Sequence, residues 1–269
     1  MPANPLVQRR VNDSVAGDQL GGQILVSSSG DVLATWFSPG RRARVLDDDG
    51  DPVSAEIALP TATSTAAWIA PDEFAILSDN GGIAIQRYDR AGAAVGGAIA
   101  VAAGGTADDL ALLASGSVVA TYRVGNEIRG RILDSTLTPA GAEFLIYNVG
   151  TRRVDETIVT PLTGGGFAFT VDFGSLGLGT PLERVALFDG SGNKTASIAP
   201  GLIEKPDVDA LPDGGFMIAS GSLNGDIRFY NADGTLRAQS TTNVVGANLD
   251  ITLLGTEIVL LTYERTVSG

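Results

Sequence analysis

The 269-residue sequence contains neither histidine nor cysteine. Their absence excludes Ser-His-Asp and Cys-His nucleophilic systems. It also excludes haem ligation by either residue and structural zinc sites built from the usual ligands. An enzyme of this composition would have to use Asp, Glu, Tyr, Ser, Lys or Arg. The lack of cysteine is compatible with any redox compartment.

Positive charge is also scarce. Lys and Arg together number 18 against 31 Asp and Glu, which gives a formal net charge of −13. Such a surface repels the phosphate backbone of nucleic acids and anionic membrane surfaces. We therefore expect no nucleic-acid partner, and we keep cations, basic protein patches and neutral glycans as candidate ligands.

No apolar run approaches the roughly 18 residues of a membrane span, so no membrane insertion is expected. The first residues, Met1-Pro-Ala-Asn-Pro-Leu-Val-Gln-Arg-Arg10, lack the apolar segment of a secretory signal. If the protein acts outside the cell, it is expected to get there without a cleaved N-terminal signal.

One short pattern recurs along the chain: a strand ends, a turn of small and polar residues follows, and a second apolar strand begins. Its clearest copy is Ala210-Leu-Pro-Asp-Gly-Gly-Phe216. The first apolar residues after the turn in the six copies are Val32, Phe74, Val118, Phe167, Phe216 and Ile258. Successive copies lie 42, 44, 49, 49 and 42 residues apart. This near-constant spacing indicates a repeat architecture.

A second signal lies between these copies: an aromatic residue or leucine, then Asp or Asn, two further residues and Gly. Four copies begin at Leu46, Tyr88, Phe188 and Tyr230, and a degenerate fifth runs from Leu133 to Leu137 without the glycine. Asp or Asn opens a type I turn, and Gly takes the left-handed position that closes a hairpin. Each unit is thus predicted to contain four strands, at 205–211, 215–220, 225–230 and 235–242 in the fifth.

We predict a single all-β domain, a six-bladed β-propeller with four-stranded antiparallel blades. The blades are expected at 18–60, 61–102, 103–148, 149–200, 201–244 and 245–269. The last has room for little beyond two strands, so a strand at 5–12 is expected to complete it and close the ring, with one strand still short or missing. A β-sandwich and a β-solenoid are the alternatives, although four strands per unit overfill a solenoid coil.

The motifs at 205–236 resemble a repeat of large bacterial exported proteins that reads approximately ALPDGGFVVxW, followed by a YDADG-type turn and a strand ending in VN. The matching residues are 210–216, 230–234 and Val11-Asn12. Such repeats occur in adhesin-like surface proteins of the haemolysin-type calcium-binding kind. The resemblance covers most of the chain and is loose in the second and sixth units. It implies export and an interaction role, and it carries over no catalytic residue. The family's calcium-binding glycine nonapeptides are absent.

Two groups of carboxylates are candidates for binding a cation. The alternating acids of Asp47-Asp-Asp-Gly-Asp51 could hold Ca²⁺, but they fall on the recurrent hairpin turn, where a solvated turn is the simpler interpretation, and Ala58 stands where an EF-hand loop needs Glu. A second group lies near the starts of first strands, which line the channel of a propeller. It could form an acidic channel mouth from Asp109, Asp155, Asp207, Asp209 and Asp250, with Asp108 and Glu156 beside them. The alternative is that these are capping and turn residues that face water. If the acids were crowded together, at least one would have a raised pKa.

The same carboxylates could supply the pair that glycosidase chemistry needs, about 5–10 Å apart. No aromatic cluster suited to sugar stacking accompanies them, because Trp36 and Trp68 fall at core-like strand positions. We therefore predict a protein that is not an enzyme, with no cofactor apart from Ca²⁺ as a candidate.

The longest insertion in the repeat is the Gly-rich stretch 172–182 in the fourth unit, which carries Phe173, Leu176 and Leu178. It is expected either to bind a partner through these apolar side chains or to fold back over its own blade. The functional hypotheses are an exported, adhesion-like interaction module at the cell surface, a phage virion component of the tail or capsid, and a carboxylate-based carbohydrate enzyme.

Overall fold

The computed structural model describes residues 11–13, 20–37, 40–60, 64–173, 185–199, 207–220, 226–241, 247–254 and 258–264. The chain divides into two compact units, Met1–Ala107 and Asp108–Gly269. Each unit is described by itself below, and the prediction of a single domain stays a prediction. Within the described ranges every regular element is a strand, so there is no helix of the length and hydropathy that a membrane span needs.

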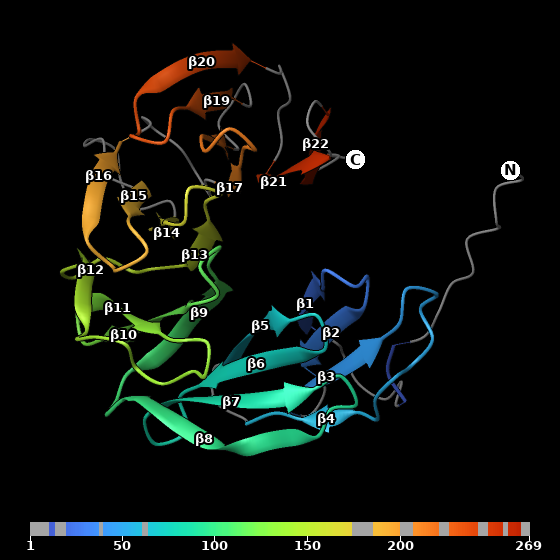
Figure 1. The fold of residues 1–269 in the computed structure, drawn as a ribbon. Coiled ribbons are helices and arrows are strands. Elements are labelled where there is room, and N and C mark those ends of the chain that lie inside the picture. Colours follow the sequence, from blue (N-terminus) through green and yellow to red (C-terminus); the bar gives the residue numbers. More distant parts are fainter. Residues whose placement is uncertain are drawn as a thin grey trace, which may run out of the picture. The chain divides into compact units, whose positions relative to one another are not determined.

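The first unit contains two four-stranded antiparallel sheets, each made of consecutive strands (Figure 1). The first sheet has the order β1 (Leu20–Val26), β2 (Val32–Phe37), β3 (Arg41–Leu46) and β4 (Ile57–Ala58). The second has the order β5 (Ser64–Ala70), β6 (Glu73–Ser78), β7 (Ile83–Asp89) and β8 (Ala94–Ala102).

The second unit repeats this plan three times. Its complete sheets are β9 (Thr106–Leu112), β10 (Val118–Val124), β11 (Glu127–Leu133) and β12 (Phe144–Asn148); β13 (Glu156–Pro161), β14 (Phe167–Asp172), β15 (Val185–Phe188) and β16 (Lys194–Ile198); and β17 (Asp207–Ala210), β18 (Phe216–Ser220), β19 (Asp226–Tyr230) and β20 (Leu236–Thr241). The final sheet pairs β21 (Ala247–Leu254) with β22 (Ile258–Glu264). The prediction of an all-β chain of four-stranded antiparallel units is confirmed for five units.

The sixth unit has two strands within the described residues. The strand predicted at 5–12 falls mostly outside them, and the described Val11 and Asn12 are not part of a strand. A count of six blades is therefore not established by the sheets themselves.

The two sequence motifs meet in space. In each complete sheet the aligned apolar residue near the start of the second strand pairs with the residue that opens the second motif on the third strand. These pairs are Val32 with Leu46, Phe74 with Tyr88, Val118 with Leu133, Phe167 with Phe188 and Phe216 with Tyr230. The aligned residues of the five complete sheets therefore occupy equivalent positions on the second strands, and Ile258 likewise begins β22.

Three of these pairs are stacked aromatic rings. The centroids of Phe74 and Tyr88 lie 5.3 Å apart, those of Phe167 and Phe188 5.0 Å, and those of Phe216 and Tyr230 5.1 Å. Cross-strand aromatic pairs of this kind stabilise a sheet by more than their buried area alone. Phe74, Val118, Phe167 and Phe216 are at most 1% exposed, whereas Val32 is half-buried.

The hairpin turns follow the predicted chemistry. Gly50, Gly92, Gly192 and Gly234 have φ between 79° and 85°, and each donates its amide to the carbonyl of the Asp or Asn three residues earlier. The degenerate copy forms the same turn with Leu137 at φ 65°, a region that non-glycine residues rarely adopt. Leu137 is buried, so packing of its side chain offsets the backbone cost.

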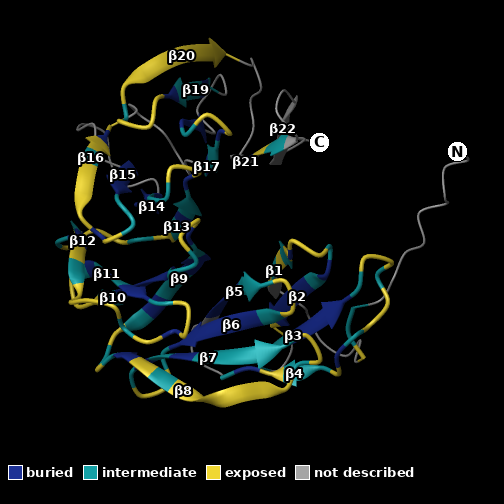
Figure 2. Cartoon of the chain, in the orientation of Figure 1, coloured by how far each residue is buried: buried dark blue, intermediate teal, exposed yellow. Residues whose placement is uncertain are grey.

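Burial increases from the fourth strand of a sheet to the second (Figure 2). All six residues of β14 are buried, whereas every residue of β20 is exposed. The apolar cores lie between successive sheets: Leu33 and Val45 of the first sheet pack with Phe74 and Ile76 of the second. Within each unit, sheets that follow one another in sequence and share apolar cores are the pattern of propeller blades.

Candidate functional site

Three of the five predicted channel-mouth carboxylates accept hydrogen bonds from the backbone of the next sheet's first strand. Asp109 of β9 accepts from the amide of Val159 in β13 at 2.7 Å. Asp207 of β17 accepts from the amide of Ile251 in β21, also at 2.7 Å. In both residues the other carboxylate oxygen accepts from the amide of the following residue.

Asp209 extends this arrangement by one more step along β17. Its Oδ2 accepts from the amide of Leu253 at 2.6 Å and from the hydroxyl of Thr252 at 3.3 Å, and its Oδ1 accepts from the amide of Ala210. Because charge-assisted bonds to backbone amides are stronger than neutral ones, these carboxylates tie β17 to β21. The carboxylate oxygens that could have bound a ligand accept hydrogen bonds from the protein's own backbone amides.

The other predicted acids are arranged differently. Asp155 forms an ion pair with Arg153 at 2.6 Å, and Glu156 is exposed. The side chain of Asp250 lies outside the described part of the chain. Among the residues that are described, no three acidic side chains come together in a way that could hold a metal ion. Cation binding at the first strands stays a prediction.

Asp108 is the acidic residue in the most unusual environment. Its side chain is 3% exposed, its Oδ1 accepts from Nε of Arg123 at 2.7 Å, and its Oδ2 has no hydrogen-bond partner among the residues that the structure describes. Burial raises the pKa of Asp108 to about 6, although the Arg123 charge acts in the opposite direction. Asp109 follows it on β9, and successive side chains of a strand point to opposite faces, so the two carboxyls are not placed as an acid–base pair.

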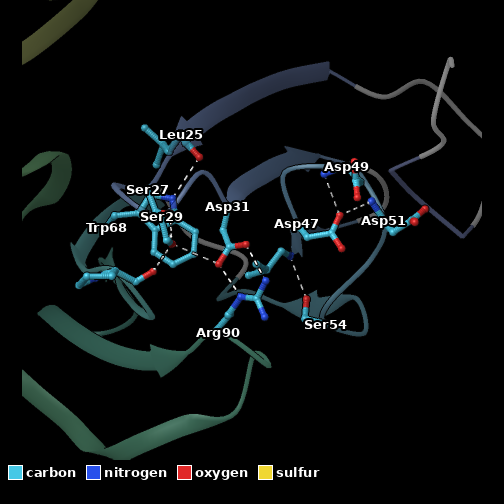
Figure 3. A network of polar contacts seen from close by, with 12 residues as sticks. Leu25, Ser27, Ser29, Asp31, Asp47, Asp49, Asp51, Ser54, Trp68 and Arg90 are labelled. Atoms are coloured by element: carbon cyan, nitrogen blue, oxygen red, sulfur yellow. Dashed lines mark hydrogen bonds and ion pairs between the residues drawn. The ribbon is translucent and has the colours of Figure 1, made fainter. Parts of the chain in front are cut away.

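The acids of the first hairpin turn act as turn caps. Oδ1 of Asp47 accepts from the amides of Asp49 and Asp51 at 3.2 Å and 2.7 Å (Figure 3). Equivalent carboxylates cap later turns, and hydrogen bonds from Thr136 and Asn193 lower the pKa values of Asp134 and Asp189 respectively. The turn interpretation therefore accounts for the contacts of Asp47.

A polar network that the sequence did not predict joins the turns of the first two sheets (Figure 3). The side chain of Asp31 is 6% exposed and binds Arg90 through two contacts. In one of them Nη2 of Arg90 donates to Oδ1 of Asp31 at 2.7 Å. The hydrogen bond from Arg90 is the largest cause that lowers the pKa of Asp31. Beside it, Ser29 donates to the carbonyl of Pro71 at 2.9 Å, and Trp68 donates Nε1–H to the carbonyl of Leu25 at 3.0 Å.

The predicted partner-binding loop is corrected at its first residue. Phe173 is 3% exposed and belongs to the core between the third and fourth sheets, where it lies 5.4 Å from the ring of Tyr147 and under the guanidinium of Arg152. The expectation that Phe173 presents an apolar surface to a partner is therefore wrong. Leu176 and Leu178 lie outside the described residues, and their role stays a prediction.

One regularity in the sequence could have revealed the ties between sheets. Gln23, Asp109 and Asp207 each stand nine residues before an aligned apolar residue. In the first unit Gln23 has the corresponding role, since its Oε1 accepts from the amide of Ala66 in β5 at 3.4 Å. An acceptor side chain at a fixed repeat position is a signal for a contact between neighbouring units.

No family model matches the sequence, and no curated protein matches it. Solved structures do resemble it. Virginiamycin B lyase from Staphylococcus aureus shares 15% identity over 91% of this chain and 84% of its own, with a TM-score of 0.62. A catalytically inactive His-to-Ala variant of that lyase, solved with quinupristin, shares 15% identity over 94% of this chain and 87% of its own, with a TM-score of 0.64. The Dos1 propeller shares 11% identity over 86% of this chain and 62% of its own, with a TM-score of 0.56.

These likenesses define the class of fold. At such low identity they show a β-propeller-like architecture and nothing about activity. They agree with the consecutive four-stranded sheets, so the propeller prediction is confirmed at that level and a sandwich or solenoid is not supported.

Proposed function

We propose that this chain is a non-enzymatic interaction propeller. The observation that carries the proposal is the use of the candidate carboxylates: Asp109, Asp207 and Asp209 accept from backbone amides of neighbouring strands. A glycosidase needs one carboxyl held ready to give a proton and a second facing it across the substrate. These three acids instead join neighbouring strands of the protein itself.

The likeness to virginiamycin B lyase does not alter this proposal. A variant of that enzyme in which alanine replaces a histidine is catalytically inactive, and this chain contains no histidine. A lyase reaction in this chain would have to proceed without a histidine. A common scaffold with a different function is the ordinary situation for large fold classes.

The proposed partner is a protein with a basic patch, or a neutral glycan, held on the face that carries the 172–182 loop. The charge of −13 favours cationic surfaces and disfavours nucleic acid. The resemblance to exported bacterial repeats supports an adhesion-like role outside the cell or on its surface.

We further propose that the repeats form a closed ring of six blades, with residues 5–12 completing the last. Ile24 of β1 supports closure. It is 74% exposed, while the residues at its repeat position in the next four sheets, Ala66, Leu110, Val159 and Val208, are between 2% and 6% exposed. A closed ring would cover Ile24 in the same way. Replacing Ile24 with Asp should then lower the free energy of unfolding sharply, whereas an uncovered Ile24 would tolerate Asp.

The partner proposal is tested with a double variant, Leu176→Ser and Leu178→Ser. Binding is measured by biolayer interferometry against cationic proteins and a glycan panel, with thermal unfolding in parallel. We expect ligands retained by the wild type to be lost by the double variant, with an unchanged melting temperature. Phe173→Ser is the matched control, and it should unfold earlier because its ring is buried. Equal binding by the double variant would remove the loop from the proposal.

The enzyme alternative is tested by incubating the protein with the same glycans and looking for cleaved products. Turnover that is lost in Asp109→Asn or Asp209→Asn would contradict the non-enzymatic proposal. These variants keep an acceptor oxygen for the backbone amides, so a loss of turnover would not be caused by unfolding.

A further inference from the structure

Arg44 of β3 is a cation in a position that is costly for a charged group. Its side chain is 7% exposed, and burying a charge is unfavourable unless it is paired and hydrogen-bonded. Two of its three nitrogens are satisfied by residues near the N-terminus. NH1 donates to the carbonyl of Val11 at 2.8 Å, and NH2 contacts the carboxylate of Asp13 at 2.7 Å.

The register of the first sheet shows which face Arg44 occupies. Ile24 pairs with Ala34, and Ala34 pairs with Arg44, so these three side chains lie in one row on one face. The opposite face carries Leu33, Ala43 and Val45, which pack with residues of the second sheet. Residues 11–13 are therefore bound on the face that is turned away from the second sheet.

The third nitrogen of Arg44 points to a missing partner. Its Nε is buried and has no acceptor among the described residues. A guanidinium donates through all of its N–H groups, and leaving a buried donor without an acceptor is unfavourable. The chain leads directly from Val11, already bound to Arg44, into residues 5–10, which read Pro-Leu-Val-Gln-Arg-Arg and lie outside the described ranges.

We propose that this face of the first sheet is a docking site for residues 5–10, with Arg44 as its anchor. A backbone carbonyl of the segment accepts from Nε of Arg44, and Leu6 and Val7 supply the apolar contacts. A second contact also holds Asp13 to the first unit, since its backbone amide donates to Oε1 of Glu56 at 2.5 Å. The inference concerns the first unit alone and does not require that the six units form a ring.

Trypsin provides the test, because it cleaves after Arg9 and Arg10 inside the proposed segment. Cleavage at these two sites in the full-length protein is followed by mass spectrometry and compared with a synthetic peptide of residues 1–15. We expect the wild type to be cut at least about tenfold more slowly than the peptide, and Arg44→Met to lose most of this protection. Arg41→Met, on the same strand, is the control and should stay protected.

Two further measurements separate anchoring from general destabilisation and from a second copy. Cleavage after Arg87 in β7 reports on unfolding of the first unit itself and should be equal in the wild type and Arg44→Met. Leu6→Asp with Val7→Asp should remove protection as Arg44→Met does. Cleavage of the wild type at the peptide's rate would overturn the proposal. Protection that appears only at high protein concentration would also overturn it, since a second copy would then be the occupant.

Discussion

The two compact units hold their neighbouring sheets together with different chemistry. In the first unit the charged contact between sheets lies at the turns, where Arg90 binds Asp31, and the contacts of Gln23 and Trp68 along the first strands are neutral. In the second unit the contacts run along the first strands, where Asp109, Asp207 and Asp209 accept from backbone amides. Within a sheet, by contrast, both units contain the same kind of cross-strand pair. A Phe on the second strand pairs with a Tyr on the third, as Phe74 does with Tyr88 and Phe216 with Tyr230.

This difference shows which part of a repeat is constrained. The hairpin between the second and third strands needs a particular turn and a particular cross-strand pair, so its residues recur. A contact between sheets can be made by any side chain that reaches the next backbone, so its residues vary. The variable contacts are where one repeat protein differs from another.

The largest expected effect tests the shared part of the comparison. Phe216→Ala removes a fully buried ring that stacks on Tyr230, and it should lower the free energy of unfolding by about 3–5 kcal/mol in urea denaturation. Phe74→Ala, which removes the corresponding stack on Tyr88 in the first unit, should cost a similar amount. Leu236→Ala is the control, since Leu236 is 55% exposed. A large difference between the two Phe variants would break the equivalence.

Asp108 gives the second unit a dependence on pH that the first unit lacks at this position, where Gly22 stands. Its pKa of about 6 lies above the unperturbed 3.8, so the folded protein holds this proton more tightly than the unfolded chain. The penalty from Asp108 is therefore present above pH 6 and disappears as the pH falls below about 4. Asp108→Asn should be more stable than the wild type by about 1–3 kcal/mol at pH 8.

Denaturant unfolding at several pH values checks this. The advantage of Asp108→Asn should shrink as the pH falls from about 6 to about 4. In both proteins stability should then fall at lower pH, because Asp31 and Asp189 have lowered pKa values and lose their favourable contacts on protonation. An advantage that does not depend on pH would mean that the pKa of Asp108 is the same in the folded and the unfolded protein.

The ties along the first strands should have intermediate effects. Asp209→Ala leaves the amide of Leu253 without its 2.6 Å acceptor and should cost about 1–2 kcal/mol. Gln23→Ala in the first unit removes neutral bonds of 3.4 Å and should cost less than about 1 kcal/mol. Asp209→Asn, which keeps an acceptor, is the control. Equal losses for the Asp and Gln variants would remove the distinction between the two units.

The smallest effect belongs to the turn contact of the first unit. Arg90→Ala removes the partner of Asp31, but the Arg90 side chain is 44% exposed, and exposed ion pairs are weakened by solvent and salt. Differential scanning calorimetry should show a smaller decrease in Tm than Asp209→Ala, and added salt should reduce it further. A decrease as large as that of Phe74→Ala would show that the turn network carries much more of the stability of the first unit.

The fold could be predicted from the sequence where the determinants are local. The strands predicted for the fifth unit, 205–211, 215–220, 225–230 and 235–242, correspond to β17–β20 within two residues. This succeeded because Pro-Asp-Gly and Asn-Ala-Asp-Gly turns fix the strand ends and the apolar alternation fixes their faces. Leu137 shows that the pattern tolerates an exception when the side chain is buried.

The candidate site was harder to predict because its contacts are not local. Asp109 reaches an amide fifty residues further along the chain, and nothing near it in sequence indicates whether a carboxylate faces water or another strand. Phe173 was expected either to face a partner or to be covered by its own blade because it stands in a Gly-rich stretch of sequence, and Tyr147 of β12 and Arg152 of the connection after it cover its ring. Both outcomes depend on packing between neighbouring sheets. The repeat places residues at the same positions in each sheet, but the residue types at these positions differ.

Amide hydrogen exchange at Val159, Ile251 and Leu253 tests the central claim most directly: the first-strand carboxylates hold neighbouring strands together and do not form a ligand site. Exchange should be slow in the wild type and should quicken at Val159 in Asp109→Ala and at Leu253 in Asp209→Ala, with calcium making no difference. The contradictory result is unchanged exchange in both variants together with a calcium-dependent rise in the Tm of the wild type that the variants lack.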